Sequence, residues 1–213
     1  MQRPQPLSDR RAMVEHQLRA RGIDDERVLT AMGRVPRELF VPPAVRAHAY
    51  DDAALPIGSD QTISQPYMVA RICAELRLRG DEKVLDVGTG SGYQAAVLAE
   101  LAREVHSIER IPELAAAARE ALAEAGYGGR VHVVDGDGSL GLPGEGPFGA
   151  IAVAAAAPEP PPALLDQLER GGRLVIPIGP PEQQFLRVYV ATPEGPADYA
   201  AVPCRFVPLV GKR

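Results

Sequence analysis

The sequence of 213 residues contains no tryptophan, only two cysteines and no long apolar run. Cys73 and Cys204 lie far apart and lack the close spacing of a metal or redox motif, so we expect two buried free thiols. No stretch is long and apolar enough to cross a membrane, and Arg3, Arg10 and Arg11 interrupt any apolar leader. These absences favour a cytoplasmic protein with no metal site and no membrane partner.

The sequence also lacks an excess of basic residues. It has 23 Lys and Arg against 28 Asp and Glu, a formal net charge of −5 at pH 7. Because nucleic-acid binding normally needs a basic face, we predict no nucleic-acid partner. The length suits one domain with a sizeable core. We therefore assign residues 1–213 to a single domain, which we expect to act as a monomer.

A glycine turn lies in the segment KVLDVGTGSGYQAAVLA, residues 83–99. The pattern predicts a strand, a tight turn and a helix. Three alternating glycines let the backbone approach a ligand closely, and the helix start offers free N–H groups. The G-x-G-x-G spacing differs from the G-x-G-x-x-G dinucleotide fingerprint, which disfavours an NAD-dependent dehydrogenase. The predicted cofactor-binding turn consists of Gly88, Thr89, Gly90, Ser91 and Gly92.

Two acidic residues accompany this turn. Asp86 precedes it by two positions, and Glu109 ends the next apolar run, about 20 residues past the turn. In a Rossmann-like fold, the second strand places a carboxylate at this point on the ribose hydroxyls of a nucleotide. We therefore predict that Asp86, Glu109 and the adjoining Arg110 belong to a nucleoside-cofactor site.

Strand and helix patterns alternate from the glycine turn to about residue 178. This alternation predicts a doubly wound, mainly parallel, Rossmann-like α/β sheet in residues 81–213. Two alternating segments near the end, 185–191 and 199–206, predict antiparallel C-terminal strands. Helical patterns beginning near Ser8 and Asp24 predict an N-terminal helical addition, and we assign residues 8–80 to a substrate-cleft region.

The segment before the glycine turn is polar and rich in turn residues, and it leads into a helix at Pro66. Proline suits the first turn of a helix, with Ser64 or Gln65 at the N-cap. On pattern alone, the simplest interpretation of Ser64 is a helix-capping serine.

Four segments together resemble bacterial protein-L-isoaspartate O-methyltransferases, which belong to the class I S-adenosylmethionine-dependent superfamily. They are VPRELFVPP (35–43), QTISQPYMVA (61–70), VLDVGTGSGYQAAVLA (84–99) and RFVPLVG (205–211). The resemblance implies methyl esterification of the free carboxylate of L-isoaspartyl residues in damaged proteins and peptides. The ester closes to a succinimide, and hydrolysis partly restores aspartate. The implied cofactor is S-adenosylmethionine, with S-adenosylhomocysteine as product.

The resemblance also implies roles for individual residues. Ser64 corresponds to the family's active-site serine. Thr62, Ile63 and Gln65 correspond to the wall of the substrate cleft. We also predict that Val207 binds substrate, since an exposed edge strand beside Ile63 or Val207 could pair with the backbone of an extended peptide. The G-D-G triplet of the family places Asp137 and Gly138 near adenine, although Asp135 is an alternative for the acidic residue.

Three positions depart from the family pattern. Gly149 replaces an aspartate and is expected to loosen a contact at a strand start. Ala154 replaces a threonine near the cleft, and Asp60 replaces a glycine. These changes leave open a class I methyltransferase that acts on another carboxylate or on a modified peptide in a biosynthetic pathway. A non-catalytic binding module is a further alternative, which the intact acidic residues and Ser64 oppose.

Overall fold

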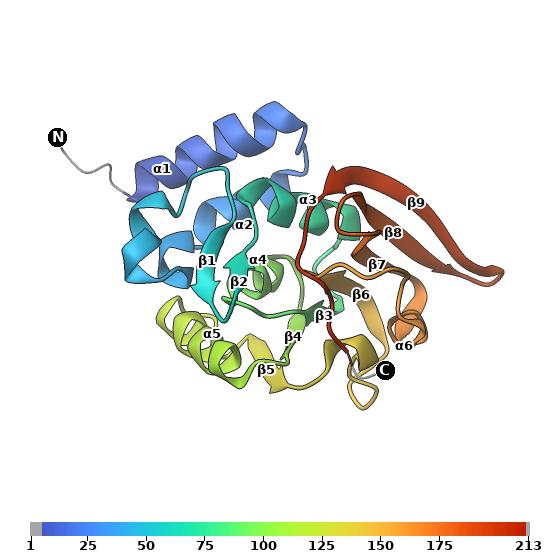
Figure 1. The fold of residues 1–213 in the computed structure, drawn as a ribbon. Coiled ribbons are helices and arrows are strands. Elements are labelled where there is room, and N and C mark those ends of the chain that lie inside the picture. Colours follow the sequence, from blue (N-terminus) through green and yellow to red (C-terminus); the bar gives the residue numbers. More distant parts are fainter. Residues whose placement is uncertain (1–5, 212–213) are drawn as a thin grey trace.

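A computed structural model describes residues 6–211, so residues 1–5 and 212–213 of the predicted domain lie outside the described part. Figure 1 shows a central twisted sheet with helices packed against it. The seven strands follow the order β5-β4-β3-β6-β7-β8-β9. They are β3 (Lys83–Val87), β4 (Glu104–Glu109), β5 (Val131–Asp135), β6 (Phe148–Val153), β7 (Leu168–Ile178), β8 (Gln184–Thr192) and β9 (Gly195–Cys204).

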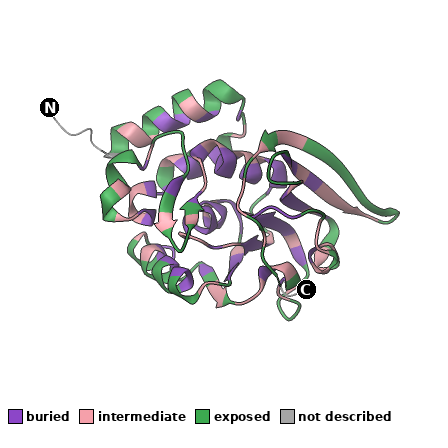
Figure 2. Ribbon diagram, in the orientation of Figure 1, coloured by how far each residue is buried: buried purple, intermediate pink, exposed green. Residues whose placement is uncertain are grey.

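The pairing pattern confirms the predicted mixed sheet. Strands β5, β4, β3, β6 and β7 pair in parallel, whereas β8 pairs antiparallel with both β7 and β9. The β8–β9 hairpin projects from the edge of the sheet (Figure 1) and is largely exposed towards its tip (Figure 2). The carboxyl ends of β3, β4 and β6 therefore lie side by side at one edge, where α/β folds bind ligands.

The helices surround this sheet. They are α1 (Pro6–Ala12), α2 (Glu26–Arg34), α3 (Pro66–Leu76), α4 (Tyr93–Leu101), α5 (Pro112–Glu124) and α6 (Pro162–Leu165). Shorter helical turns are η1 (Met13–Leu18), η2 (Arg19–Arg21), η3 (Arg37–Phe40), η4 (Pro43–His48) and η5 (Gly138–Leu140). The structure ends α6 at Leu165 and begins β7 at Leu168.

The two faces of the sheet bury different cores. Successive strand residues point to opposite faces, so Val84 joins the large core beneath the N-terminal helices, α3 and α4. Leu85 and Val87 join a smaller core that includes Leu164 of α6. Because both faces are buried, β3 is apolar except for Lys83 at its start and Asp86.

The N-terminal helices form as predicted, with different caps. The first helical run begins at Pro6, so Ser8 lies within it, and the run ends at Gly22 with a φ of 83°. The cap of α2 is Asp25 and not Asp24. The Asp25 carboxylate accepts hydrogen bonds from the backbone N–H groups of Arg27 at 2.9 Å and Val28 at 3.3 Å.

The turn-rich segment before α3 forms a hairpin that the sequence patterns did not predict. Strands β1 (Leu55–Gly58) and β2 (Gln61–Ile63) pair antiparallel. Ser59 and Asp60 connect them with φ values of 51° and 56°. A glycine adopts this left-handed backbone freely, and aspartate tolerates it better than most residues. The turn geometry therefore suits the glycine that the resemblance implies at position 60.

Gly149 lies where a side chain would collide with its neighbour. A Cβ atom there would approach Cγ of Glu82 to 2.9 Å. Glu82 is fixed, because its carboxylate accepts hydrogen bonds from the backbone N–H groups of Arg79 and Gly80, both at 2.8 Å. Glu82 therefore fills the space beside Gly149, and the pairing of β6 with β7 is irregular between Phe148 and Ala150. The loosened contact at this strand start stays a prediction.

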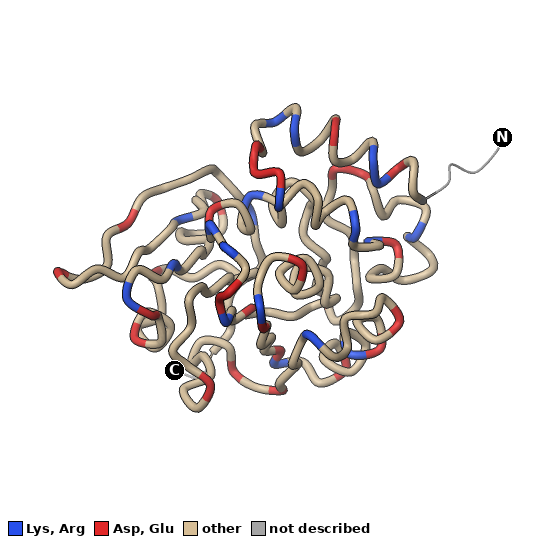
Figure 3. Tube along the Cα trace, turned by 180° about the vertical axis from the view of Figure 1, so that it is seen from behind, with Lys and Arg blue, Asp and Glu red and all other residues tan. Residues whose placement is uncertain are grey.

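Charged residues of both signs are intermixed along the chain, as seen from behind in Figure 3. Within residues 6–211, no helix is long and apolar enough to cross a membrane. Cys73 is buried and Cys204 is half-buried, and neither forms a disulfide.

Candidate active site

The glycine turn follows β3 at the carboxyl edge of the sheet. Gly88, Gly90 and Gly92 have φ values of 90°, 51° and 87°, which favour glycine. The turn is closed by a hydrogen bond from Gly92 N to Thr89 O at 2.8 Å. Gly92 is the N-cap of α4 and has no side chain, and the first N–H group of the helix, that of Tyr93, donates to the Ser91 hydroxyl at 3.3 Å.

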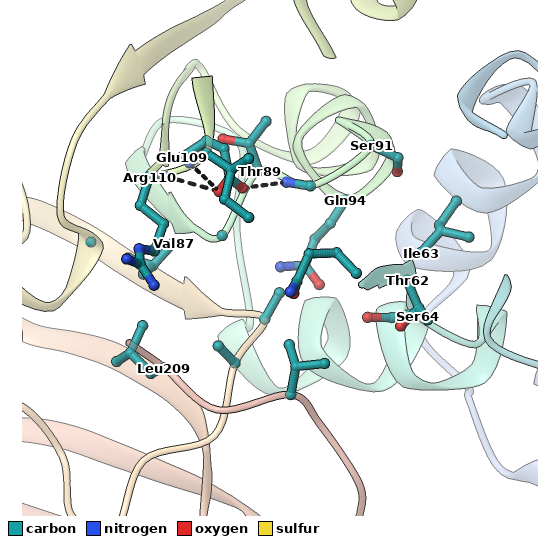
Figure 4. Close-up of a pocket in the computed structure, with 18 of the residues that line it drawn as sticks. Thr62, Ile63, Ser64, Val87, Thr89, Ser91, Gln94, Glu109, Arg110 and Leu209 are labelled. Atoms are coloured by element: carbon teal, nitrogen blue, oxygen red, sulfur yellow. Dashed lines mark hydrogen bonds between the residues drawn. The ribbon is translucent and has the colours of Figure 1, made fainter. Parts of the chain in front are cut away.

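Glu109 lies beside this turn at the end of β4. One carboxylate oxygen accepts a hydrogen bond from the N–H of Gly90 at 2.9 Å. The other accepts from the N–H groups of Arg110 at 2.9 Å and Ile111 at 3.0 Å (Figure 4). The carboxylate thus joins the turn to the next loop. Since each oxygen has two lone pairs, Oε2 can accept a further hydrogen bond from a ligand.

Asp86 lies behind the turn and not on the surface of the cleft. It is fully buried and accepts hydrogen bonds from Gln94 Nε2 at 2.8 Å and Ser107 Oγ at 2.7 Å. Ser107 Oγ lies 2.6 Å from the Thr89 hydroxyl. Burial raises the pKa of Asp86 to about 6. Asp86 therefore supports the turn and α4 through a buried polar network.

These elements line a cleft with an empty volume of about 860 Å³, counted to its open mouth. Eleven predicted residues line the cleft: Thr62, Ile63, Ser64, Gly88, Thr89, Gly90, Ser91, Glu109, Arg110, Gly138 and Val207. In Figure 4, Ser64 and its β2 neighbours lie across the cleft from Glu109 and Arg110.

A second groove adjoins this cleft, with an empty volume of about 1200 Å³ counted to its mouth. Gln65 lines this groove and not the cleft. Four residues line both spaces, and they are Thr62, Ser64, Ala154 and Val207. These four residues form the wall between the cleft and the groove, and we call them the shared wall.

Ser64 does not cap α3. The N-cap of α3 is Gln65, and its side chain makes no capping hydrogen bond. The helix-capping interpretation of Ser64 is therefore wrong. Its side chain is half-buried in the shared wall, where the hydroxyl of a serine can donate to a bound group.

The structure places the G-D-G segment at the edge of the cleft. Gly138 lines the cleft, and a Cβ atom there would lie 2.5 Å from Val87. The Asp137 carboxylate accepts hydrogen bonds from the N–H of Ser139 at 3.0 Å and from its hydroxyl at 2.7 Å. Asp135, the alternative residue, instead forms an ion pair with Arg119 at 2.7 Å.

Two parts of the cleft were missed by sequence reasoning. Gln94 lines the cleft from α4, and its Oε1 atom is buried without a partner among residues 6–211. Residues 208–210 also line it, because Leu209 N donates to Ala156 O at 2.7 Å. The resemblance of the RFVPLVG segment to the family indicated this region, but Val207 was the single residue of the segment that we predicted to belong to the site. Among residues 6–211, no three His, Cys, Asp or Glu side chains are placed to hold a metal ion.

Comparisons with known proteins agree with this geometry. Residues 8–213 match the family model described as Protein-L-isoaspartate(D-aspartate) O-methyltransferase (PCMT). The chain is 54% identical over 207 residues to a protein-L-isoaspartate O-methyltransferase of Methanoculleus marisnigri, covering 96% of this chain and 92% of that protein. It is 56% identical over 212 residues to protein-L-isoaspartate O-methyltransferase 2 of Marinobacter nauticus, covering 98% and 96%.

A solved structure shows the same fold. It is described as a protein-L-isoaspartate O-methyltransferase from Plasmodium falciparum in complex with S-adenosyl-L-homocysteine. It superposes with a TM-score of 0.81 at 26% sequence identity, and the match covers 94% of this chain and 98% of that chain. The chain thus belongs to the protein-L-isoaspartate(D-aspartate) O-methyltransferase family.

Proposed function

We propose that the protein transfers a methyl group from S-adenosylmethionine to the free carboxylate of an L-isoaspartyl residue at the shared wall. The observation that supports this most directly is the wall itself, because Ser64 faces both the cleft and the groove. A cofactor in the cleft and a peptide in the groove would meet there. The ester product then closes to a succinimide, which begins repair of the damaged chain.

The residues of the cleft fit an adenosine-containing cofactor. Glu109 offers a charged acceptor for ribose hydroxyls, and the glycine turn allows close approach of the backbone. Gly138 has no side chain, so its backbone packs directly against Val87 at the edge of the cleft. Arg110 lines the same end of the cleft, where its exposed side chain can cover a bound ring.

The chemistry needs positioning and not proton removal. When bound, S-adenosylmethionine supplies a sulfonium methyl group for transfer. A carboxylate with a pKa of about 3.9 is already ionised at neutral pH, so no general base is required. We assign Ser64 as the hydrogen-bond donor that holds one carboxylate oxygen while the other faces the methyl group. Holding the reacting atoms in line contributes most of the rate in such a step.

The groove fits an extended peptide. Within residues 6–211, strand β2 pairs only with β1, so its other backbone edge is available. We propose that the substrate backbone pairs there, beside Ile63 and Val207, while Thr62 and Gln65 contact its flanks. Backbone N-methylation of an isoaspartyl peptide should then reduce its methylation, and unchanged activity would contradict the pairing.

The decisive experiment uses two peptides that differ only at one residue. The protein is incubated with labelled S-adenosylmethionine and either an isoaspartyl peptide or its normal aspartyl counterpart. Base-labile label on the isoaspartyl peptide alone is the expected result. Label on neither peptide, or on both, would contradict the proposal. We also propose that the active unit is a monomer. Light scattering at assay concentration tests that proposal.

A further inference from the structure

Arg37 is a fully buried arginine behind the shared wall. It lies in the VPRELFVPP segment, which has no role in the function proposed so far. Its Nε donates to the carbonyl of Ala49 at 2.7 Å, and its Nη2 donates to the carbonyl of Ser64 at 2.8 Å. The guanidinium also lies over the Tyr93 ring, 4.8 Å from the centroid. Arg37 thus connects the Ser64 segment to the start of α4, where Tyr93 lines the cleft.

The charge of Arg37 has no counterion in the described part of the chain. Among residues 6–211 no carboxylate pairs with it, and Nη1 is buried without a hydrogen-bond partner. By contrast, Arg10 pairs with Glu38 at 3.1 Å. Burial lowers the pKa of Arg37 to about 10, so the guanidinium remains charged at neutral pH. A buried, unpaired charge is costly, so its presence beside Ser64 calls for a functional explanation.

We propose that Arg37 is a positioning residue for the methyl acceptor. Its hydrogen bond fixes the Ser64 carbonyl, and its unneutralised charge favours the substrate carboxylate at Ser64. The inference rests on the proposed function, because it needs an anionic acceptor at the shared wall. The charge of Arg37 then acts on that carboxylate across the Ser64 segment, because Arg37 itself lines neither the cleft nor the groove.

The local structure explains why Ser64 needs this support. Ser64 lies between the end of β2 and the N-cap of α3, and no side chain caps that helix. The hydrogen bond from the Arg37 guanidinium to the Ser64 carbonyl therefore holds the segment between β2 and α3 in place. A shift of Ser64 by about 1 Å would misplace the carboxylate relative to the methyl group, and such shifts can cost about 100-fold in rate.

Two substitutions separate the hydrogen bonds from the charge. Arg37→Lys keeps the charge, but a single ammonium cannot span both carbonyls, so we expect kcat to fall about tenfold while the peptide KM stays within about threefold. Arg37→Met also removes the charge, so we expect the peptide KM to rise about tenfold as well. The Kd of S-adenosylhomocysteine should stay within about threefold in both variants, because Glu109 and the glycine turn are unchanged.

Arg27 provides a matched control. It also donates to two backbone carbonyls, those of Leu78 and Leu101. Neither Leu78 nor Leu101 lines the cleft or the groove, whereas Ser64 lines both, and Arg27 is more exposed than Arg37. Arg27→Met should reduce thermal stability and leave kcat and KM unchanged. Rates are expressed per S-adenosylhomocysteine-binding site, measured by titration, so that unfolded molecules of any variant are not counted.

A double-mutant cycle with Ser64→Ala tests the connection. If Arg37 acts through Ser64, Arg37→Lys should cost much less kcat in the Ser64→Ala background than in the wild type. Equal costs in the two backgrounds would overturn the inference, as would unchanged kinetics per binding site in both Arg37 variants. These results leave the proposed function intact, whereas a wild-type protein that does not methylate the isoaspartyl peptide overturns both.

Discussion

Removal of the Glu109 carboxylate should weaken cofactor binding by an amount that follows from its contacts. The side chain is 6% exposed and accepts three backbone N–H groups, two of them at 2.9 Å and one at 3.0 Å. Hydrogen bonds to a charged group are worth about 1.5–3 kcal/mol each. Loss of one such bond to a ribose hydroxyl corresponds to a Kd for S-adenosylhomocysteine that rises about 10- to 150-fold in Glu109→Ala.

The structure adds a second consequence of this substitution. Without the carboxylate, the N–H groups of Gly90, Arg110 and Ile111 lose their acceptor, so the turn and the following loop become less ordered in the free protein. We therefore expect the thermal stability of the unliganded variant to fall as well, and part of the affinity loss to come from reordering the turn.

Isothermal titration calorimetry with S-adenosylhomocysteine measures this effect directly. Asp135→Ala is the matched control, because Asp135 occupies the register position opposite Glu109 on β5 but pairs with Arg119. Its Kd should stay within about twofold of the wild type. A Glu109→Ala variant with the wild-type Kd would refute the ribose contact. An equal loss of affinity for S-adenosylhomocysteine in both variants would show that any carboxylate at this edge of the sheet influences cofactor binding to the same extent.

Three further predictions test other parts of the site and fold. Ser64→Ala should lower kcat on an isoaspartyl peptide about 10- to 100-fold and leave the cofactor Kd within about threefold; wild-type turnover would exclude the positioning role. The folded-state pKa of Asp86 is raised to about 6, so the folded protein binds the extra proton, and stability should fall as pH rises from 4 to 7. Relative to Asp86→Asn, the free energy of unfolding measured in urea should fall by up to about 3 kcal/mol between pH 4 and pH 7. Stability curves that run parallel with pH for the two proteins would contradict this prediction. Gly149→Asp, which restores the family's usual residue, should destabilise the protein by about 1–3 kcal/mol, because its Cβ would meet Glu82 at 2.9 Å; a change below about 0.5 kcal/mol in urea unfolding would show that Glu82 moves aside.

Local sequence patterns were sufficient to predict the structure of residues 83–109, which form β3, the glycine turn, α4 and β4. The glycine turn, the apolar strands and the acidic residue at the end of β4 follow each other closely in the chain. Each pattern reflects a local requirement: left-handed backbone in the turn, burial of both faces in the strands, and a carboxylate at a strand end. The same patterns could not separate Asp86, which is buried behind the turn, from Glu109, which lines the cleft.

The positions of Ser64 in the shared wall and of Arg37 behind it could be recognised only from the tertiary structure. Ser64 alone resembles a helix cap, and only the tertiary structure, which brings β2 and residues 207–210 to one cleft, places it between two cavities. Arg37 is an ordinary charged residue in the sequence, and burial of its guanidinium is decided by elements up to 56 positions away, such as Tyr93. Sequence periodicity records which face of an element is apolar, whereas burial of a single charge depends on every element that packs around it. For this reason the sequence determined the fold and the cofactor class, and the tertiary structure decided which side chains meet at the proposed site of methyl transfer.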